Sequence, residues 1–485
     1  MNSAALPRAA GGSDPFGCAE AVKKMQEAFK TGPGCAIMKP NELRRYGMSD
    51  TMQEVLRFIE ENDVKFIRLA FCDIFGIQKN ISIMPGELPR AFSSGICFDA
   101  SAFRGFMHIE QSDLLLLPDP ATLSILPWRP SQGRVVRFFC DIRYPDGQPF
   151  EGDGRHILRE AEARAKSHGL TCKIGTESEF YLFELDENGE PTLSPHDHAG
   201  YFDVAPLDKG ENVRRQICLT LEEMGIQPES SHHEQGPGQN EIDFKYSDAL
   251  EAADNLVTFK WVVRTMAAGS GLFASFLPKP LPGASGSGLH INLSLFQNGR
   301  NMFRTREEHS QTCESFIAGI LERAGELTVF LNPLTNSYRR FGKFEAPKYI
   351  TWSHQNRSPL VRIPSATGEL SRMELRSPDA GANPYLAVAL LIHAGMDGID
   401  RALALPEPCN ENLFSARAEI TGRYAALPGS LRDAVELANG SAFLREHLPA
   451  RTFTSYLTAK AEEWERYQAA GDKQQIEREL YFAHY

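Results

Sequence analysis

Two glutamates at the start of an apolar strand place the strongest restriction on how this chain can fold. The stretch from Gly175 to Phe183 is GTESEFYLF, and its aromatic second half predicts a β-strand. Residues two apart in a strand share a face, so Glu177 and Glu179 point to the same side as Tyr181. Neighbouring carboxylates over a half-buried surface repel one another unless a multivalent cation lies between them. Two explanations remain open at this point: a solvated strand end, or a cation site.

The length and charge of the chain narrow the classes of function. Its 485 residues exceed one ordinary core, which predicts two or more domains. The formal net charge of -12 argues against binding to nucleic acid or to an anionic membrane. The nine cysteines are scattered without a C-x-x-C motif, which indicates reduced thiols and a cytoplasmic location. No apolar stretch is long enough to span a bilayer, so we expect neither membrane insertion nor secretion.

Composition divides the chain into three segments. Residues 1–48 carry little apolar sequence and are expected to form a leader that is poorly ordered in part. Residues 49–150 begin with an amphipathic helix and continue with short strands, which predicts a small α+β domain. A Pro/Gly/Asp-rich sequence ends this segment, and residues 151–485 are expected to form a larger domain.

Other chemically active residues follow Glu179 along the chain. Glu234 and Glu241 flank a Gly/Pro loop between two short strand-like pieces, so the fold can bring them together. His290 begins a strand after a Gly/Ser loop that would let backbone approach a ligand closely. Glu374 shares a strand face with Arg376. Taken one at a time, these features are equally typical of solvated turns and flexible loops.

Basic residues become frequent between residues 332 and 376. They are Arg339, Arg340, Lys343, Lys348, Arg357, Arg362, Arg372 and Arg376. Arginine binds carboxylate and phosphate in a bidentate manner, so this segment suits an anionic nucleotide and an anionic substrate. Salt bridges to the acidic excess are the alternative.

Taken as an ordered set, these motifs resemble glutamine synthetase of type I. The motifs include FDASAFRGF, GTESEFYLF, HHEQGPGQNEI, GSGLHINLSLF, NPLTNSYRRF and ELRSPDAGANPYL, and the resemblance covers about residues 64–485. It implies an α+β protein with a small N-terminal β-grasp domain and a large catalytic domain. In the catalytic domain, helices would surround an antiparallel half-barrel sheet.

The resemblance also implies two divalent cations, Mg²⁺ or Mn²⁺, in each site. Glu179, Glu234 and Glu241 would hold one ion, and Glu177, His290 and Glu374 the other. Five carboxylates and one imidazole, without a thiolate, suit these hard ions.

The reaction that the resemblance implies is ligation of ammonia to the γ-carboxylate of glutamate through γ-glutamyl phosphate, with ATP as co-substrate. The catalytic positions would be Asp99, Glu345, Arg340 and Arg357, and the substrate-binding positions Gly286, Arg340 and Arg376. ATP would contact Glu229, Tyr246, Ser294, Arg357, Arg362 and Arg372. Asp99 and Glu345 would attract and deprotonate ammonium, with Glu345 on a closing flap.

Family members are dodecamers of two hexameric rings, and Asp99 would serve the active site of the adjacent subunit. Phe414 stands where one subtype carries a modified tyrosine, so the chain is expected to belong to the unadenylylated alpha-like subtype.

Three departures lie near the pockets for ammonium and glutamate. The family's FDGSS is FDASA here, which replaces a serine by Ala102, and Ser285 stands where an asparagine is usual. The flap is one residue shorter. A γ-glutamyl ligase for a polyamine or another primary amine is therefore an alternative, and a catalytically inactive sensor or scaffold is a second one. Retention of Asp99 and Glu345 favours ammonia.

Overall fold

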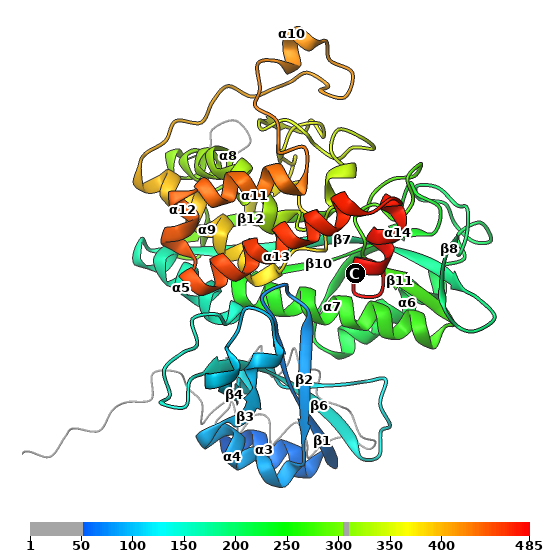
Figure 1. Cartoon of the computed structure of the whole chain (residues 1–485), viewed down its shortest axis with the longest axis vertical. Coiled ribbons are helices and arrows are strands. Elements are labelled where there is room, and N and C mark those ends of the chain that lie inside the picture. Colours follow the sequence, from blue (N-terminus) through cyan, green and yellow to red (C-terminus); the bar gives the residue numbers. More distant parts are fainter. Residues whose placement is uncertain (1–51, 304–309) are drawn as a thin grey trace, which may run out of the picture.

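Two β-sheets organise the chain in the computed structural model, which describes residues 52–303 and 310–485. The smaller sheet occupies the lower part of Figure 1, and the larger sheet lies above it among most of the helices. The predicted leader, residues 1–48, lies outside the described residues.

The smaller sheet has six strands in the order β2-β1-β6-β4-β3, with β5 paired to β6. Strands β1 and β6 run parallel, and the other pairs are antiparallel. Helices α3 (Met52–Glu61) and α4 (Leu88–Ser94) pack against it. The strands are β1 (Val64–Cys72), β2 (Gln78–Ile83), β3 (Ile96–Asp99), β4 (Asp113–Pro118), β5 (Ser124–Ile125) and β6 (Arg134–Arg143).

The turn after β1 explains both the end of that strand and the approach of the two units. The side-chain Oδ1 of Asp73 accepts hydrogen bonds from the backbone N–H groups of Phe75 and Ile77, each at 3.0 Å. Gly76 completes the turn with a φ of +79°, and a Cβ there would lie 2.7 Å from the Cα of Asn383. Glycine therefore lets this turn lie directly against the large unit.

The larger sheet has ten strands, and β7 runs through its middle. The main order is β14-β15-β16-β12-β7-β10-β9, with β8 and β11 also paired to β7 and β13 to β12. Only the β14–β15 pair among these described strands is parallel. The strands are β7 (Leu170–Leu185), β8 (Pro191–Pro195), β9 (Pro228–His233), β10 (Gln239–Asp248), β11 (Leu272–Ser275), β12 (Leu289–Gln297), β13 (Arg300–Asn301), β14 (Trp352–His354), β15 (Val361–Ile363) and β16 (Met373–Leu375).

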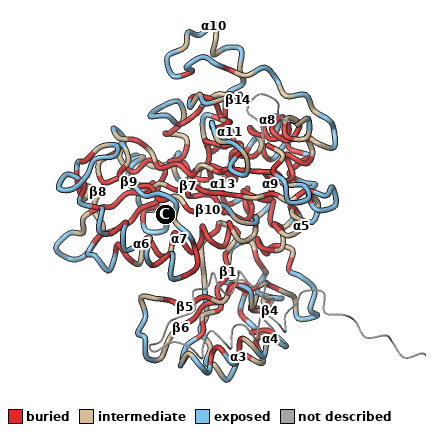
Figure 2. The backbone as a smooth tube through the Cα atoms, turned by 180° about the vertical axis from the view of Figure 1, so that it is seen from behind, coloured by how far each residue is buried: buried red, intermediate tan, exposed pale blue. Residues whose placement is uncertain are grey.

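Helices surround the larger sheet, and the tube in Figure 2 shows the buried residues concentrated between helices and strands. Helices α8 and α9 pack closely because Gly398 of α9 has no side chain. A Cβ at that position would lie only 2.0 Å from the carbonyl oxygen of Ser315 in α8. The helices of this unit are α5 (Gly154–Ser167), α6 (Glu211–Glu223), α7 (Ala249–Gly269), α8 (Gln311–Leu331), α9 (Pro384–Asp400), α11 (Leu431–Gly440), α12 (Ala442–His447), α13 (Ala450–Ala469) and α14 (Lys473–Glu477). The predicted fold class, a small α+β unit joined to a half-barrel with surrounding helices, is confirmed.

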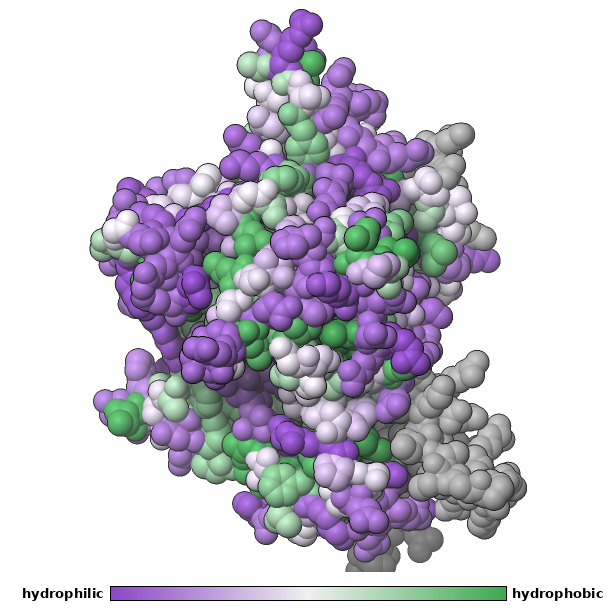
Figure 3. Space-filling model, turned by 90° about the vertical axis from the view of Figure 1, so that its right-hand side faces the viewer, coloured by the Kyte–Doolittle hydropathy of each residue, from purple (hydrophilic) through white to green (hydrophobic). Residues whose placement is uncertain are grey.

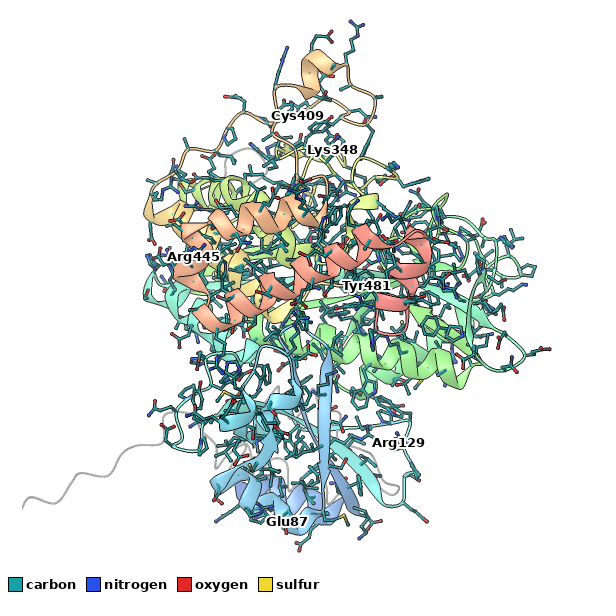
Figure 4. The ribbon with its side chains drawn as sticks, viewed as in Figure 1. Glu87, Arg129, Lys348, Cys409, Arg445 and Tyr481 are labelled. Atoms are coloured by element: carbon teal, nitrogen blue, oxygen red, sulfur yellow. The ribbon has the colours of Figure 1, made fainter. Side chains whose placement is uncertain are left out.

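Two segments at the edge of this unit differ in burial. The short helix α10 (Ala418–Thr421) lies on a projection whose base is marked by Lys348 and Cys409 in Figure 4. Tyr481, also labelled there, is instead buried with Tyr181 and Phe183 of β7. The C-terminal segment therefore covers the apolar half of the β7 face that carries the two glutamates.

The outer surface is mostly hydrophilic in the view of Figure 3, with hydrophobic residues dispersed among polar ones. Within residues 52–303 and 310–485, no helix combines the length and apolar character that crossing a membrane requires.

Candidate active site

The polar half of the β7 face gathers acidic residues from neighbouring strands. Glu177 lies directly opposite His290 of β12 on one side and Asp243 of β10 on the other. Glu179 lies opposite Glu241 of β10. Residues that face each other across paired strands lie on the same side of a sheet, so the predicted alternation does bring these groups together.

One cluster of metal-ligand type forms around His290. Its Nδ1 lies 3.2 Å from Oε2 of Glu177 and 3.5 Å from Oε1 of Glu374. One donor atom from each of the three residues falls within 4.8 Å of the others. The structure thus assembles the predicted trio of Glu177, His290 and Glu374 from three different strands.

A second cluster contains one residue that the predicted ligand set lacks. His232 of β9 lies 3.5 Å from Glu234 and 3.7 Å from Glu241, and the donor atoms of the three again fall within 4.8 Å. Glu179, the predicted third ligand, accepts hydrogen bonds from Nε2 of Gln239 at 2.7 Å and from the backbone N–H of Gly288 at 3.0 Å. The register of β9 against β10, which pairs His232 with Glu241, is the signal that points to His232.

The two clusters differ in how their charge is balanced. Burial raises the pKa of Glu177, but the hydrogen bond and charge of His290 together with Asn292 and Arg372 outweigh burial and lower the pKa to about 2. Burial and the charge of Glu179 raise the pKa of Glu234 to about 7 and that of Glu241 well above its usual range. Negative charge is therefore in excess around Glu234 and Glu241, which is the condition that a bound cation relieves.

The donor atoms fit a hard divalent cation. Both clusters offer carboxylate oxygens and one imidazole nitrogen, and neither contains a thiolate. A third group, Asp197, Asp208 and His233, is already satisfied within the protein. Arg214 binds both carboxylate oxygens of Asp208, and His233 bridges Asp197 at 2.8 Å and the carbonyl of Glu234 at 2.7 Å. This third group supports the loop that carries Glu234.

A cavity of about 580 Å³ opens over the carboxylate face. It brings together residues predicted for metal, substrate and phosphate binding: Glu177, Glu179, Glu234, Glu241, His290, Gly286, Arg340, Glu345, Arg357, Arg362, Arg372 and Arg376. Glu374 is buried beside it, between Arg362 at 2.6 Å and Arg376 at 3.1 Å. Arg340 is also buried and donates to the carbonyl of Ser377 at 3.0 Å.

A smaller cavity of about 120 Å³ adjoins the first. Its lining contains the other residues predicted for ATP, namely Glu229, Tyr246 and Ser294. Glu177, Asp243 and Arg372 line both cavities, so the two spaces meet at these three residues. Asp243 is not among the predicted site residues. Burial and the charge of Glu177 raise its pKa to about 6, and its Oδ1 is buried without a hydrogen-bond partner.

The predicted flap lies at the edge of the larger cavity in a strained conformation. Phe344 and Glu345 have φ values of +46° and +65°, in the left-handed region that side chains other than glycine disfavour. Nε2 of Gln235 donates to Oε1 of Glu345 at 3.3 Å, and Nη1 of Arg376 donates to its backbone carbonyl at 3.2 Å. These contacts aim the carboxylate of Glu345 at the cavity.

Asp99 is the one predicted catalytic residue that this chain does not bring to either cavity. It ends β3 in the small unit, where it is exposed and accepts a hydrogen bond from the backbone N–H of Ser101 at 2.9 Å. Ala102 lies in the same turn. Ser285, by contrast, lines the larger cavity, and its carbonyl accepts a hydrogen bond from Tyr181 at 2.7 Å.

Comparison with known proteins adds independent information. Family models described as "Glutamine synthetase, beta-Grasp domain" and "Glutamine synthetase, catalytic domain" match residues 63–145 and 151–481. The chain is 46% identical over 436 residues to a glutamine synthetase of Methanosarcina mazei, covering 89% of this chain and 98% of the relative. It is 45% identical over 443 residues to the Thermus thermophilus glutamine synthetase, covering 89% and 99%.

Solved structures show the same similarity. A complex of the protein titled GmaS with ADP superposes with a TM-score of 0.80 at 30% identity, covering 89% of this chain and 99% of that one. The glutamine synthetase of Plasmodium falciparum gives a TM-score of 0.78 at 24% identity, covering 87% and 97%, and this likeness concerns the fold alone.

Proposed function

This chain belongs to the glutamine synthetase family, and from that premise we propose how its residues divide the work of the reaction. The chain is an ATP-dependent ligase that makes glutamine from glutamate and ammonia. One observation carries the proposed division: both clusters of metal-ligand type contribute to the cavity with the predicted glutamate residues, and Glu177 of one cluster also lines the cavity with the predicted nucleotide residues.

Two Mg²⁺ or Mn²⁺ ions would occupy these clusters. Glu177, His290 and Glu374 would hold one, and Glu179, Glu234 and Glu241 the other, with His232 as a neighbouring donor. When bound, the ions neutralise charge on the phosphate groups. The excess of carboxylates around Glu241 supports this proposal, because it is costly to keep without a cation.

The nucleotide would enter the smaller cavity. Glu229, Tyr246 and Ser294 line that cavity and would hold ATP. Arg372, where the two cavities join, and Arg357 and Arg362 in the larger cavity would meet its phosphates with their guanidinium groups. Their positive charge would compensate the negative charge that spreads over the transferred group, which favours phosphoryl transfer.

Glutamate would lie in the larger cavity against Arg340, Arg376 and the loop at Gly286. Its γ-carboxylate oxygen attacks the terminal phosphorus of ATP, the bond to the leaving ADP oxygen breaks, and γ-glutamyl phosphate forms. Ammonia then attacks the carbonyl carbon of the acyl phosphate, and the bond to the leaving phosphate breaks. Ammonium must lose a proton first, and the carboxylate of Glu345, which lines the same cavity, would accept it.

Asp99 would contribute to the ammonium site of a neighbouring subunit. It is exposed in this chain and lines neither cavity of its own chain, which supports a site completed between subunits. We propose a dodecamer of two hexameric rings on this basis, together with the family resemblance. The exposed Phe414, which has no hydroxyl to modify, supports the unadenylylated alpha-like subtype. The seven free cysteines among the described residues support a cytoplasmic location.

A direct test measures phosphate release from ATP with glutamate and Mg²⁺, comparing ammonium with putrescine, spermidine and ethanolamine. We expect release and glutamine formation with ammonium. A strong preference for a larger amine would instead assign the altered pocket at Ser285 and Ala102 to another γ-glutamyl amide. Silence with every amine would refute the proposed division of roles.

A further inference from the structure

Lys279 lies beside the active site, but none of the roles above uses it. It is only 4% exposed and follows β11 in the segment Phe276-Leu277-Pro278. Its backbone is fixed on both sides by Asn336, whose Oδ1 accepts from the backbone N–H at 2.5 Å and whose Nδ2 donates to the carbonyl at 3.1 Å. The position of the Lys279 main chain is therefore set independently of its side chain.

The ammonium group of Lys279 contacts the substrate loop, which we define as residues 283–288. Nζ donates a hydrogen bond to the backbone carbonyl of Ala284. The next two residues of that loop, Ser285 and Gly286, line the larger cavity, and Gly286 is the position expected to meet glutamate. One end of this contact is thus the loop that would bind the amino acid.

The same ammonium group contacts the flap, which we define as residues 341–347. Nζ lies 4.2 Å from the centre of the Phe344 ring, within the range of a cation–π interaction. Phe344 lines the cavity and precedes Glu345, the proposed proton acceptor. A single buried cation therefore touches both the glutamate loop and the flap.

The conformation of the flap explains why such a contact would matter. Phe344 and Glu345 both lie in the left-handed region, which is unfavourable for side chains other than glycine, so contacts with the surroundings must hold them there. Two backbone hydrogen bonds close the flap turn, from the N–H of Gly342 to the carbonyl of Ala346 at 2.9 Å and from the N–H of Ala346 to the carbonyl of Lys343 at 3.0 Å. Phe344 is 49% exposed, so the Lys279 contact is a large part of what holds its ring.

We propose that Lys279 is a positioning residue that couples the substrate loop to the flap. When Ala284 is in place, the ammonium group holds Phe344 and keeps Glu345 over the cavity. The flap then shields γ-glutamyl phosphate until ammonia attacks. Without this coupling, water attacks the carbonyl carbon of the acyl phosphate instead, the bond from that carbon to the phosphate oxygen breaks, and glutamate and phosphate are released after ATP has been hydrolysed. This inference rests on the proposed function, and it names a residue that determines how much of the ATP hydrolysis leads to glutamine.

The test compares Lys279→Met with Lys279→Arg in the full-length assembled enzyme. The measured quantity is the ratio of phosphate released to glutamine formed, together with glutamate-dependent phosphate release in the absence of ammonium. We expect a ratio near one for the wild type and an increase of about fivefold or more for Lys279→Met. Arginine keeps a cation over the ring, so Lys279→Arg should restore most of the coupling.

Two further variants keep the test decisive. Phe344→Leu removes the ring but keeps apolar bulk, and it should raise the same ratio even if Lys279→Met fails to assemble. Lys343→Met, an exposed neighbour on the same flap, is the matched control and should leave the ratio unchanged. Because the two residues act through one contact, Lys279→Met and Phe344→Leu together should raise the ratio little beyond the larger single effect.

A wild-type ratio in both Lys279→Met and Phe344→Leu would overturn the coupling while leaving the proposed function intact. Equal uncoupling in Lys279→Met and Lys279→Arg would also overturn it, because the cation would then be irrelevant. A wild-type enzyme that releases no phosphate with any amine would instead contradict the proposed function itself.

Discussion

Two buried clusters of carboxylates in this molecule balance their charge in opposite ways. At the junction of the two units, Arg155 of α5 contacts Asp119 at 2.9 Å, Asp141 at 3.0 Å and Asp254 at 3.1 Å. On the carboxylate face of the large sheet, Glu234 and Glu241 stand near Glu179 with His232 between them, and no arginine or lysine contact is found for this pair among the described residues. The junction contains its own cation, whereas the pair of Glu234 and Glu241 on the sheet face does not.

The difference separates a structural cluster from a functional one. Burial lowers the pKa of Arg155, but Asp254 and the other aspartates raise it well above its usual range, so the guanidinium stays charged and joins the units. Around Glu241, burial and neighbouring carboxylates raise the pKa instead. Carboxylates that repel one another in this way favour uptake of positive charge from solution, as a proton or as a metal ion.

The first prediction concerns a variant that removes the buried cation at the junction of the two units. Arg155→Met should lower the free energy of unfolding by about 3–5 kcal/mol, because three carboxylates lose their buried partner. Thermal or urea unfolding at a fixed protomer concentration measures this loss. Arg159→Met is the matched control: its guanidinium contacts Asp119 and Asp141 but is 34% exposed, so about 1 kcal/mol or less is expected. Equal losses in both variants would contradict the structural role assigned to Arg155.

The second prediction tests whether the carboxylates on the sheet face bind a divalent cation from solution. Mn²⁺ at 100 times its dissociation constant should stabilise the wild type by about 2.7 kcal/mol for one site, because it binds only the folded chain. Calorimetric titration and the shift in melting temperature both measure this effect without requiring activity.

Two variants test whether Mn²⁺ binds on the sheet face rather than at the junction of the two units. Glu177→Gln should lose the stabilisation that one site contributes, since it removes a ligand from the trio with His290 and Glu374. Arg159→Met should keep it. A Glu177→Gln protein that binds two Mn²⁺ ions as tightly as the wild type would show that this trio is not a metal site.

Local sequence predicts the strands of this molecule better than it predicts their partners. Alternation in GTESEFYLF predicts that Glu177 and Glu179 share a face, and the structure agrees. His232 and Asp243 escape prediction because each becomes part of the site only through the register of β9, β10 and β7. Helix α8 shows another limit of local pattern: most of its surface is buried, so its sequence lacks the broad polar face that marks an amphipathic helix.

The family resemblance supplies what local pattern could not, but only in part. The predicted residues of the two cavities come together in one chain. Asp99 does not join them, because its proposed place depends on a second subunit, which neither a single sequence pattern nor a single chain contains.

A third buried site, around His393, extends the comparison to a histidine that remains uncharged. His393 of α9 stacks on His447 with ring centres 4.2 Å apart, and its Nδ1 lies 3.4 Å from Nη1 of Arg164. Burial, His447 and Arg164 lower the pKa of His393 to about 3. Here a cation is already present, so the histidine stays neutral rather than adding a second positive charge.

This arrangement predicts the smallest of the three effects, a loss of stability on mild acidification. The unfolded chain binds a proton at His393 below about pH 6.5, whereas the folded chain resists protonation down to about pH 3, so stability falls as pH decreases through this window. Between pH 7 and pH 5 the expected loss is about 1–2 kcal/mol. His393→Asn should flatten the pH dependence of the unfolding free energy over this interval, although it lowers stability at pH 7. If the variant keeps the full wild-type slope, the acid sensitivity originates elsewhere, and the neutral state of His393 does not contribute to it.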